Sequence, residues 1–316
     1  MIDTLTTSRA AFPVLSAPET AKLLALRRNG VALAYTETSR AGSETPPLVF
    51  IHGWAGDHAT FLPQIEHFKW THRTIAVDLR GHGRSDKPDQ NYTVTGFASD
   101  VIWLCSQLGV VKPVIIGHSM GGAIALEIAA RYPDAIEAIV MIDSVVFPIH
   151  GLKEYVLRPV EAALCGPDYR EAIRQAIAGL FLPTDDPACR ARLMERAATT
   201  PQHVALPAFR NHLIDYNASE FAAACKVPVG YIASANPMAD LARFRMRCPQ
   251  LVTGQVMQAG HFAPLVAPDQ VNNMLERFLA INARQTGDLS SLSKEVNVST
   301  SVNRPISAIG KAGART

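Results

Sequence analysis

A serine between glycines is the side chain of this sequence best suited to covalent chemistry. Ser119 is the central residue of GHSMG at 117–121, a Gly-x-Ser-x-Gly pattern. An apolar run precedes it and an Ala-rich segment follows it, which is the strand–turn–helix context that a nucleophile elbow requires. Gly117 and Gly121 let the strand and the helix approach each other, and the sharp turn presents the hydroxyl at the start of the helix. The pattern therefore predicts Ser119 as the nucleophile of an acyl transfer.

A serine nucleophile needs a general base to take its proton, and His261 is the candidate. The chain contains ten histidines, so position must decide between them. His261 lies late in the chain, after the last apolar run, and this fits the chain order serine, acid, histidine. His203 and His212 lie in a helical segment and are expected to be surface or packing residues.

Acyl transfer also needs two backbone N–H groups that stabilise the negative oxygen of the intermediate. The residue after the nucleophile, Met120, is expected to supply one of them. The other is assigned to Trp54 in HGWAG at 52–56, where an early apolar run ends. The indole of Trp54 would line the pocket, and His52 is expected to be a structural hydrogen-bonding residue.

The elements that must position these residues alternate between apolar runs and helical segments. The predicted strands lie at 30–38, 48–53, 74–81, 114–117, 136–143, 227–235 and 252–261. Helices are predicted at 93–108, directly after Ser119, and at 269–283. This alternation predicts an α/β fold with a mainly parallel central sheet, covered by helices on both faces.

The region between the fourth and fifth parallel strands differs from the rest. Residues 147–220 are rich in Ala, Arg and Leu, are broken by prolines and contain no buried strand pattern, so they predict a helical cap. The core then comprises 30–146 and 221–283. Residues 1–29 are predicted to be an N-terminal arm. Residues 284–316 are rich in small polar residues and are predicted to be a disordered tail.

Composition excludes several classes of function. The 316 residues are 48% hydrophobic and 18% charged, which fits a globular enzyme, and a net charge of +2 is too small to indicate a nucleic-acid partner. The five cysteines are scattered and predict free thiols in a reducing compartment. With no long apolar run and no leader pattern, the expectation is a cytoplasmic enzyme without a membrane partner, a metal or a cofactor. The oligomeric state stays open.

Five motifs together resemble one large superfamily. They are HGWAG at 52–56, DLRGHGRSD at 78–86, GHSMGG at 117–122, IVMID at 139–143 and AGHF at 259–262. In this order they resemble the α/β-hydrolase superfamily, in its branch of soluble serine esterases and lactonases with a helical cap. The resemblance covers roughly residues 30–283 and specifies the fold far better than the substrate. It implies a structural loop at 78–86, so Asp78, Arg80 and Asp86 receive no catalytic role.

The acid that orients His261 is where the sequence departs from this family. Most relatives carry an Asp in the loop after the strand that matches 227–235, but here Asn236 occupies that place. A neutral amide cannot stabilise an imidazolium as a carboxylate does. Two replacements are available: Asp143, 24 residues after Ser119, and Asp240. Asp143 is favoured, because some branches, zearalenone-type lactonases and cofactor-free quinolone dioxygenases among them, place the acid after the matching strand.

These residues predict a carboxylic ester hydrolase that works through an acyl-enzyme. A lactonase or an amidase would use the same triad. Two other classes stay open: a cofactor-independent dioxygenase of the same fold, and a non-catalytic binding module. Dehalogenases and epoxide hydrolases of this fold use an Asp nucleophile, so Ser119 argues against both. A largely hydrophobic pocket is predicted from apolar residues of the cap, namely Phe147, Tyr155, Leu157, Phe181 and Phe209.

Overall fold

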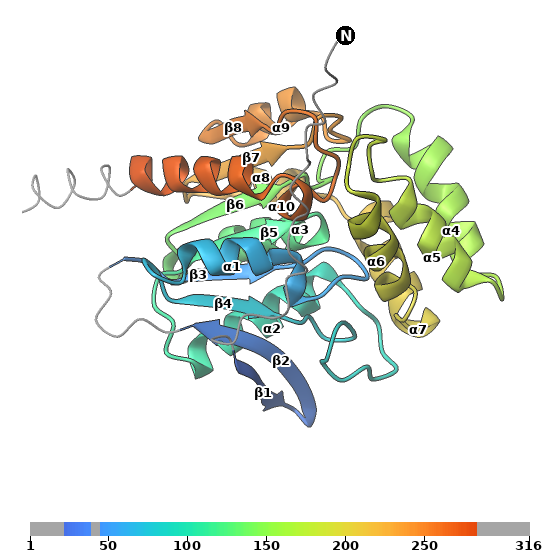
Figure 1. Ribbon diagram of the computed structural model, residues 1–316. Coiled ribbons are helices and arrows are strands. Elements are labelled where there is room, and N and C mark those ends of the chain that lie inside the picture. Colours follow the sequence, from blue (N-terminus) through green and yellow to red (C-terminus); the bar gives the residue numbers. More distant parts are fainter. Residues whose placement is uncertain (1–21, 39–44, 283–316) are drawn as a thin grey trace, which may run out of the picture. The chain divides into compact units, whose positions relative to one another are not determined.

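An eight-stranded sheet runs through the computed structural model, which describes residues 22–38 and 45–282 (Figure 1). The strands lie in the order β1-β2-β4-β3-β5-β6-β7-β8. Their bounds are β1 Lys22–Arg28, β2 Val31–Thr38, β3 Leu48–Ile51, β4 Thr74–Val77, β5 Val114–His118, β6 Ala138–Ile142, β7 Val229–Ala233 and β8 Leu251–Gln255. β2 pairs antiparallel with β1 and β4, and all other neighbours are parallel. The predicted mainly parallel sheet is confirmed.

The first strand corrects the predicted boundary of the N-terminal arm. Residues 22–28 form β1, joined to β2 by Asn29 and Gly30, whose φ angles are 49° and 83°. Two successive residues with positive φ make the tight turn that matches the twist of a hairpin. Leu24 and Leu26 pack against the core from the inner face of β1. The rest of the arm and the predicted tail, 284–316, lie outside the described residues.

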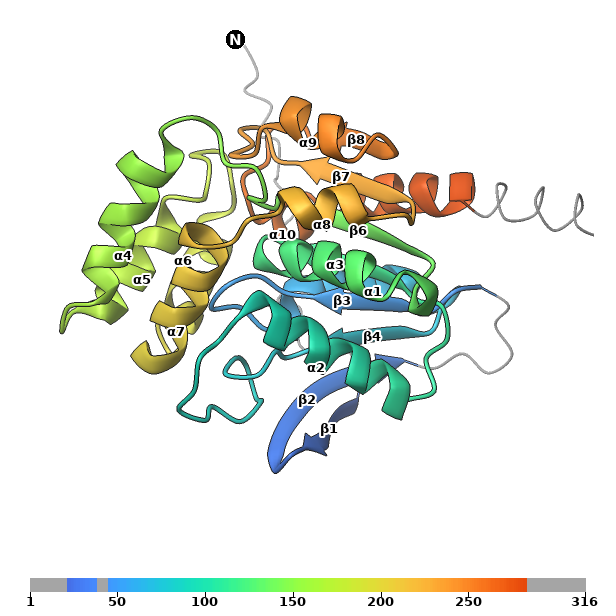
Figure 2. The ribbon, with the colours of Figure 1, turned by 180° about the vertical axis from the view of Figure 1, so that it is seen from behind.

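Helices cover both faces of the sheet, as predicted. α2, α3 and α8 lie on one face (Figure 2), and α1 lies on the other (Figure 1). β3 to β7 are buried along their whole lengths, because parallel strands between two helical layers have no solvent face. The helices of this part are α1 Leu62–Phe68, α2 Val94–Gln107, α3 Met120–Arg131, α8 Ser219–Ala224, α9 Leu241–Arg247 and α10 Ala263–Val266. A further helix spans 268–282.

A helical cap lies between β6 and β7 in the chain. It consists of α4 Arg158–Leu164, α5 Tyr169–Ala178, α6 Pro187–Ala197 and α7 Gln202–Phe209, with π-helical turns at Lys153–Leu157 and Arg210–Ile214. The cap has its own apolar cluster, which also includes Ala55, Val145 and Phe262 from loops of the core. These loops follow β3, β6 and β8, so the cap packs over the carboxyl ends of the parallel strands.

The chain divides into two compact units at Met274. The sheet, the cap and every residue of the site described below belong to the first unit, residues 1–274. Among the described helices, none combines the length and the apolar character that crossing a membrane requires.

Close backbone packing at the turn between β5 and α3 yields a prediction. A Cβ atom on Gly121 would overlap the carbonyl oxygen of Ile51, a backbone atom that cannot move aside. We expect Gly121→Ala to lower the free energy of unfolding by about 3 kcal/mol or more, measured by urea denaturation. Gly179→Ala is the matched control, because a Cβ there would meet nothing closer than 3.5 Å. Equal stabilities of the two variants would contradict this packing.

Candidate active site

Ser119 occupies a strained turn between β5 and α3. Its backbone angles are φ 54° and ψ −117°, a region that residues with a side chain rarely adopt. Its N–H donates to the carbonyl oxygen of Ile142 at 2.9 Å, which fixes the turn to the neighbouring strand β6. Met120 follows as the first residue of α3, where a backbone N–H has no partner within the helix. The half-buried Ser119 residue therefore lies beside the first N–H group and the positive end of α3.

His261 and Asp143 form a buried pair. The Nδ1 of His261 lies 2.7 Å from Oδ2 of Asp143, although 118 residues separate them. Asp143 directly follows β6 with φ 46°, and its Oδ1 accepts from the N–H of Ser234 at 3.0 Å. Burial raises the pKa of Asp143. The hydrogen bond and charge of His261, together with the hydrogen bond from the N–H of Ser234, lower this pKa by more than burial raises it, so the net shift is downward. The ionised carboxylate accepts from Nδ1–H and leaves Nε2 free to take a proton.

The other candidate acid, Asp240, and the neutral Asn236 each have a different setting. Asp240 is the N-cap residue of α9, and its Oδ1 accepts from the N–H of Arg243 at 2.9 Å. Asn236, in the place where most relatives have the acid, is exposed. The structure therefore brings Asp143 to His261 and gives Asp240 a capping role.

The loop after β3 lies directly against the nucleophile. A Cβ atom on Gly53 would come within 2.9 Å of the Cβ of Ser119. The carbonyl oxygen of Gly53 accepts from Nδ1 of His52 at 2.7 Å and from the N–H of Gly56 at 3.1 Å. Because a trans peptide is planar, the N–H of Trp54 points to the opposite side from this carbonyl. The role of this N–H as an oxyanion donor stays a prediction.

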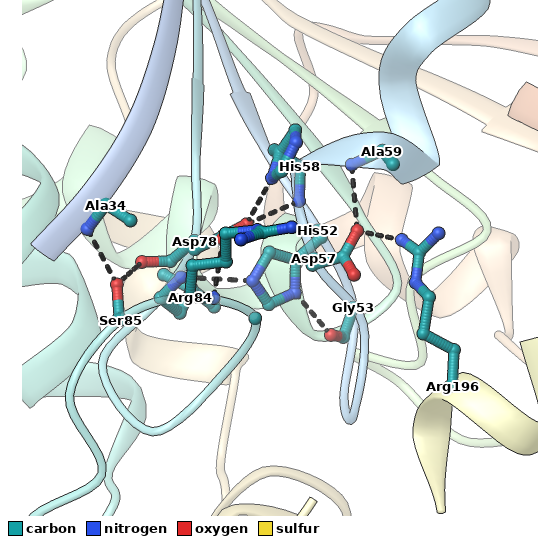
Figure 3. A network of polar contacts seen from close by, with 12 residues as sticks. Ala34, His52, Gly53, Asp57, His58, Ala59, Asp78, Arg84, Ser85 and Arg196 are labelled. Atoms are coloured by element: carbon teal, nitrogen blue, oxygen red, sulfur yellow. Dashed lines mark hydrogen bonds and ion pairs between the residues drawn. The ribbon is translucent and has the colours of Figure 1, made fainter. Parts of the chain in front are cut away.

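A network of polar contacts holds this loop in place (Figure 3). Nε2 of His52 accepts from the N–H of Leu79 at 3.0 Å, so each ring nitrogen of His52 has a partner. Asp78 accepts from the N–H groups of His58 at 2.7 Å and Arg84 at 2.8 Å. The motif at 78–86 therefore supports the loop through hydrogen bonds, which agrees with its expected structural role.

The same network contains a group of possible metal ligands. Ligand atoms of Asp57, His58 and Asp78 lie within 4.8 Å of one another. The carboxylate of Asp57 accepts from the N–H of Ala59 at 2.9 Å and pairs with Arg196 of α6. Each oxygen of the Asp78 carboxylate already accepts from an N–H group, Oδ1 from His58 and Oδ2 from Arg84. The two carboxylates therefore act as hydrogen-bond acceptors, Asp57 joins the loop to the cap through Arg196, and a metal would have to displace these donors.

A large cavity opens over Ser119 and His261, between the core and the cap. Its volume is about 770 Å³. Trp54 lines it, and the indole N–H donates to the carbonyl oxygen of Ala205 in α7 at 2.8 Å. Most of the lining comes from apolar side chains of the cap and its hinges, among them Val145, Leu157, Val160, Ile177, Leu180, Phe209, Leu213 and Met238. The predicted hydrophobic pocket is present.

Three of the five cap residues predicted for this pocket lie elsewhere. Phe147 packs against Phe244 of α9 with ring centroids 5.2 Å apart. Tyr155 is exposed to solvent, and Phe181 stacks on Phe262 at 4.9 Å. Composition alone cannot indicate which side of a cap helix faces the core, so these positions could not be separated from Leu157 and Phe209.

The cap also contacts the loop that carries His261. The N–H of His261 donates to the carbonyl oxygen of Leu180 at 3.1 Å, and the N–H of Gly260 donates to Asp185 at 3.3 Å. His118, next to the nucleophile, donates from Nε2 to the carbonyl oxygen of His261 at 2.9 Å. The base is therefore held from both the cap and the core.

Four buried histidines predict acid-sensitive stability. Burial lowers the pKa of His52, His118 and His212 to about 3, and that of His82 to about 4. The unfolded chain binds protons at these positions near pH 6.5 and the folded chain does not, so folding weakens as the pH falls below about 6.5. Each group contributes up to about 1.4 kcal/mol per pH unit between these values. Urea denaturation at pH 7.5, 6.5 and 5.5 should show this decline, and a constant stability would contradict it.

The strand order, the sharp turn at Ser119 and the match to a family model all indicate the same fold. Residues 46–161 match the family described as alpha/beta hydrolase fold. The chain has the α/β-hydrolase fold.

The similar proteins include hydrolases of several kinds. The chain is 27% identical over 253 residues to the 2-(acetamidomethylene)succinate hydrolase of Mesorhizobium japonicum. The matched region covers 74% of this chain and 88% of the relative. The enol-lactonase of Burkholderia xenovorans superposes with a TM-score of 0.73 at 20% identity, over 81% of this chain and 100% of that one. A thermophilic esterase of Thermogutta terrifontis gives 0.72 at 21% identity, over 83% and 99%. At such identities the solved structures establish the fold only.

Proposed function

We propose that this protein hydrolyses a carboxylic ester of a small, uncharged and largely hydrophobic substrate through an acyl-enzyme on Ser119. One observation carries the proposal. His261 is hydrogen-bonded at 2.7 Å to the carboxylate of Asp143, and it lines the same cavity as the strained Ser119. A nucleophile, a base and an orienting acid are the three groups that serine acyl transfer requires.

The proposed reaction has two steps. Nε2 of His261 takes the hydroxyl proton as Oγ of Ser119 attacks the ester carbonyl, and the N–H groups of Trp54 and Met120 stabilise the negative oxygen. The imidazolium then gives its proton to the leaving alcohol, and the acyl group stays on Ser119. His261 takes a proton from a water molecule as it attacks the acyl-enzyme, and the imidazolium then returns that proton to Oγ of Ser119 as the acid leaves. Asp143 stays ionised and stabilises the imidazolium in both steps.

The lining of the cavity supports an uncharged substrate. Among the described residues that line it, none is Lys or Arg. Two carboxylates, Asp168 and Glu171, do line it, and both are exposed. An anionic substrate would meet repulsion at these carboxylates and find no cation inside. The Mesorhizobium relative is named for a succinate derivative, and this cavity lacks the cations that two carboxylates would need.

The test combines turnover with covalent labelling. The purified protein is incubated with p-nitrophenyl acetate, butyrate and octanoate, and separately with γ- and δ-lactones. A fluorophosphonate probe followed by peptide mass spectrometry identifies the labelled side chain. Ester turnover with the label on Ser119 supports the proposal, and faster lactone turnover would assign a lactonase with the same triad. Absence of both turnover and label would overturn the proposal.

A further inference from the structure

His212 differs from every other buried histidine that the structure describes. It lies in the π-helical turn Arg210–Ile214 of the cap, and its residue is only 2% exposed. Neither Nδ1 nor Nε2 has a protein hydrogen-bond partner within the described residues. The buried rings of His52, His82, His118 and His261 each have at least one partner. Leaving both nitrogens of a buried imidazole unpaired costs free energy, so a packing role alone does not explain a histidine here.

His212 belongs to the lining of the reaction cavity, which also contains Ser119 and His261. Its closest lining neighbours in the chain are Phe209 and Leu213, both apolar. The turn that carries it is one residue wider than an α-helical turn, since the N–H of Asp215 donates to the carbonyl oxygen of Arg210, five residues earlier. Such wide turns redirect side chains and are frequent at functional sites.

The imidazole offers an uncharged donor and an uncharged acceptor. Burial, together with the charge of nearby His261, lowers the pKa of His212 to about 3. The neutral ring has one N–H donor and one lone-pair acceptor. A hydroxyl group can pair with either nitrogen, because it both donates and accepts. A carboxylate could accept from the N–H of the neutral ring, but it would bring an unpaired charge into an apolar cavity.

We propose that His212 is a substrate-binding residue that hydrogen-bonds a hydroxyl group on the acyl part of the substrate, which makes the preferred substrate a hydroxy ester. This inference rests on the proposed ester hydrolysis. The sequence-based expectation was a surface or packing residue; burial excludes the surface alternative, and the proposal adds a binding role. It also gives the apolar cavity a means of selection, since a buried polar group discriminates against substrates that leave it unpaired.

The experiment compares p-nitrophenyl butyrate with its 2-hydroxy and 3-hydroxy analogues. Wild type is expected to hydrolyse at least one hydroxy ester with a kcat/KM that exceeds the butyrate value by about tenfold or more. His212→Leu should lose this preference, and His212→Gln, which retains a donor and an acceptor, should restore part of it. The exposed His203 of the cap provides the control, and His203→Leu should behave as wild type. Equal rates for the three esters in wild type, or a preference that survives in His212→Leu, would overturn the proposal.

Two further measurements separate the possible failures. Thermal unfolding of His212→Leu should show an unchanged or higher Tm, because an unpaired polar group is removed. A purely structural role predicts a lower Tm and an equal loss of rate for all three esters. Calorimetric binding of the three esters to Ser119→Ala, with and without His212→Leu, tests the hydroxyl contact without turnover. If wild type hydrolyses no ester, the proposed function fails, and the calorimetry still decides whether His212 binds the hydroxyl.

Discussion

A Ser119→Ala variant is expected to lose ester hydrolysis by a factor of about 10⁴ to 10⁶ in kcat, because the nucleophile of the acyl-enzyme is removed. The hydroxyl is absent, but the elbow backbone that holds this position is unchanged in length and packing. We expect the variant to fold, to keep its affinity for a slowly hydrolysed ester, and to resist fluorophosphonate labelling. Stopped-flow release of p-nitrophenol measures the chemical step directly.

The matched control for this variant is Ser106→Ala. Ser106 is exposed on α2, and its hydroxyl donates to the carbonyl oxygen of Trp103 within the same helix. Its loss should leave turnover within about twofold of wild type, as expected for a surface change. A Ser119→Ala protein that retained most of its turnover would exclude the acyl-enzyme. The reaction would then depend on His261 and Asp143 alone, as in the dioxygenase alternative, and oxygen consumption with hydroxylated heteroaromatics would be the next measurement.

The sequence predicted the sheet well because its parallel strands carry a strong local signal. Runs such as Val114–His118 and Ala138–Ile142 are buried on both faces, so nearly every residue in them is apolar. β1 was assigned to the arm instead, although Asn29-Gly30 is a strong hairpin signal. In this edge strand, exposed and half-buried positions alternate from residue 23 to 28. The residue types of KLLALRR do not follow this alternation, because apolar residues occupy both kinds of position.

The site was predictable to the extent that local motifs position it. The elbow at Ser119 and the loop at Gly53 each depend on a short stretch, where glycine is the only residue that avoids overlap with neighbouring atoms. The role of His212 was not predictable in this way. It depends on which side of a cap turn borders the cavity. The π-helical turn Arg210–Ile214 sets that side, and no residue pattern in the sequence predicts such a turn. Motifs that bend the backbone can be read from sequence, but side-chain direction in an irregular helix requires coordinates.

The position of the acid relative to His261 was also not predictable from local sequence, because the two residues are far apart in the chain. Asp143 and Asp240 were both candidates, because 118 and 21 residues separate them from His261 and chain distance does not order them in space. The parallel pairing of β6 with β7 is what brings Asp143 to His261. It places the end of β6 beside Ser234, whose N–H then binds Asp143 and turns the carboxylate toward His261.

This arrangement predicts a severe effect for Asp143→Asn. The N–H of Ser234 requires an acceptor, so the amide of the variant places its oxygen there and its NH₂ group toward Nδ1 of His261. Nδ1 must then accept, and the ring carries its proton on Nε2, the nitrogen that should take the proton of Ser119. We expect kcat to fall by about 10⁴ with little change in fold or in substrate affinity.

Asp240→Asn is the control that separates the two candidate acids. An amide oxygen can still accept from the N–H of Arg243, so the cap of α9 is retained and turnover should stay within about twofold of wild type. A large loss in Asp240→Asn together with a nearly active Asp143→Asn would move the acid to Asp240. Because both variants change one oxygen to a nitrogen, the difference between them reports which carboxylate supports His261 and is insensitive to a general effect of lost charge.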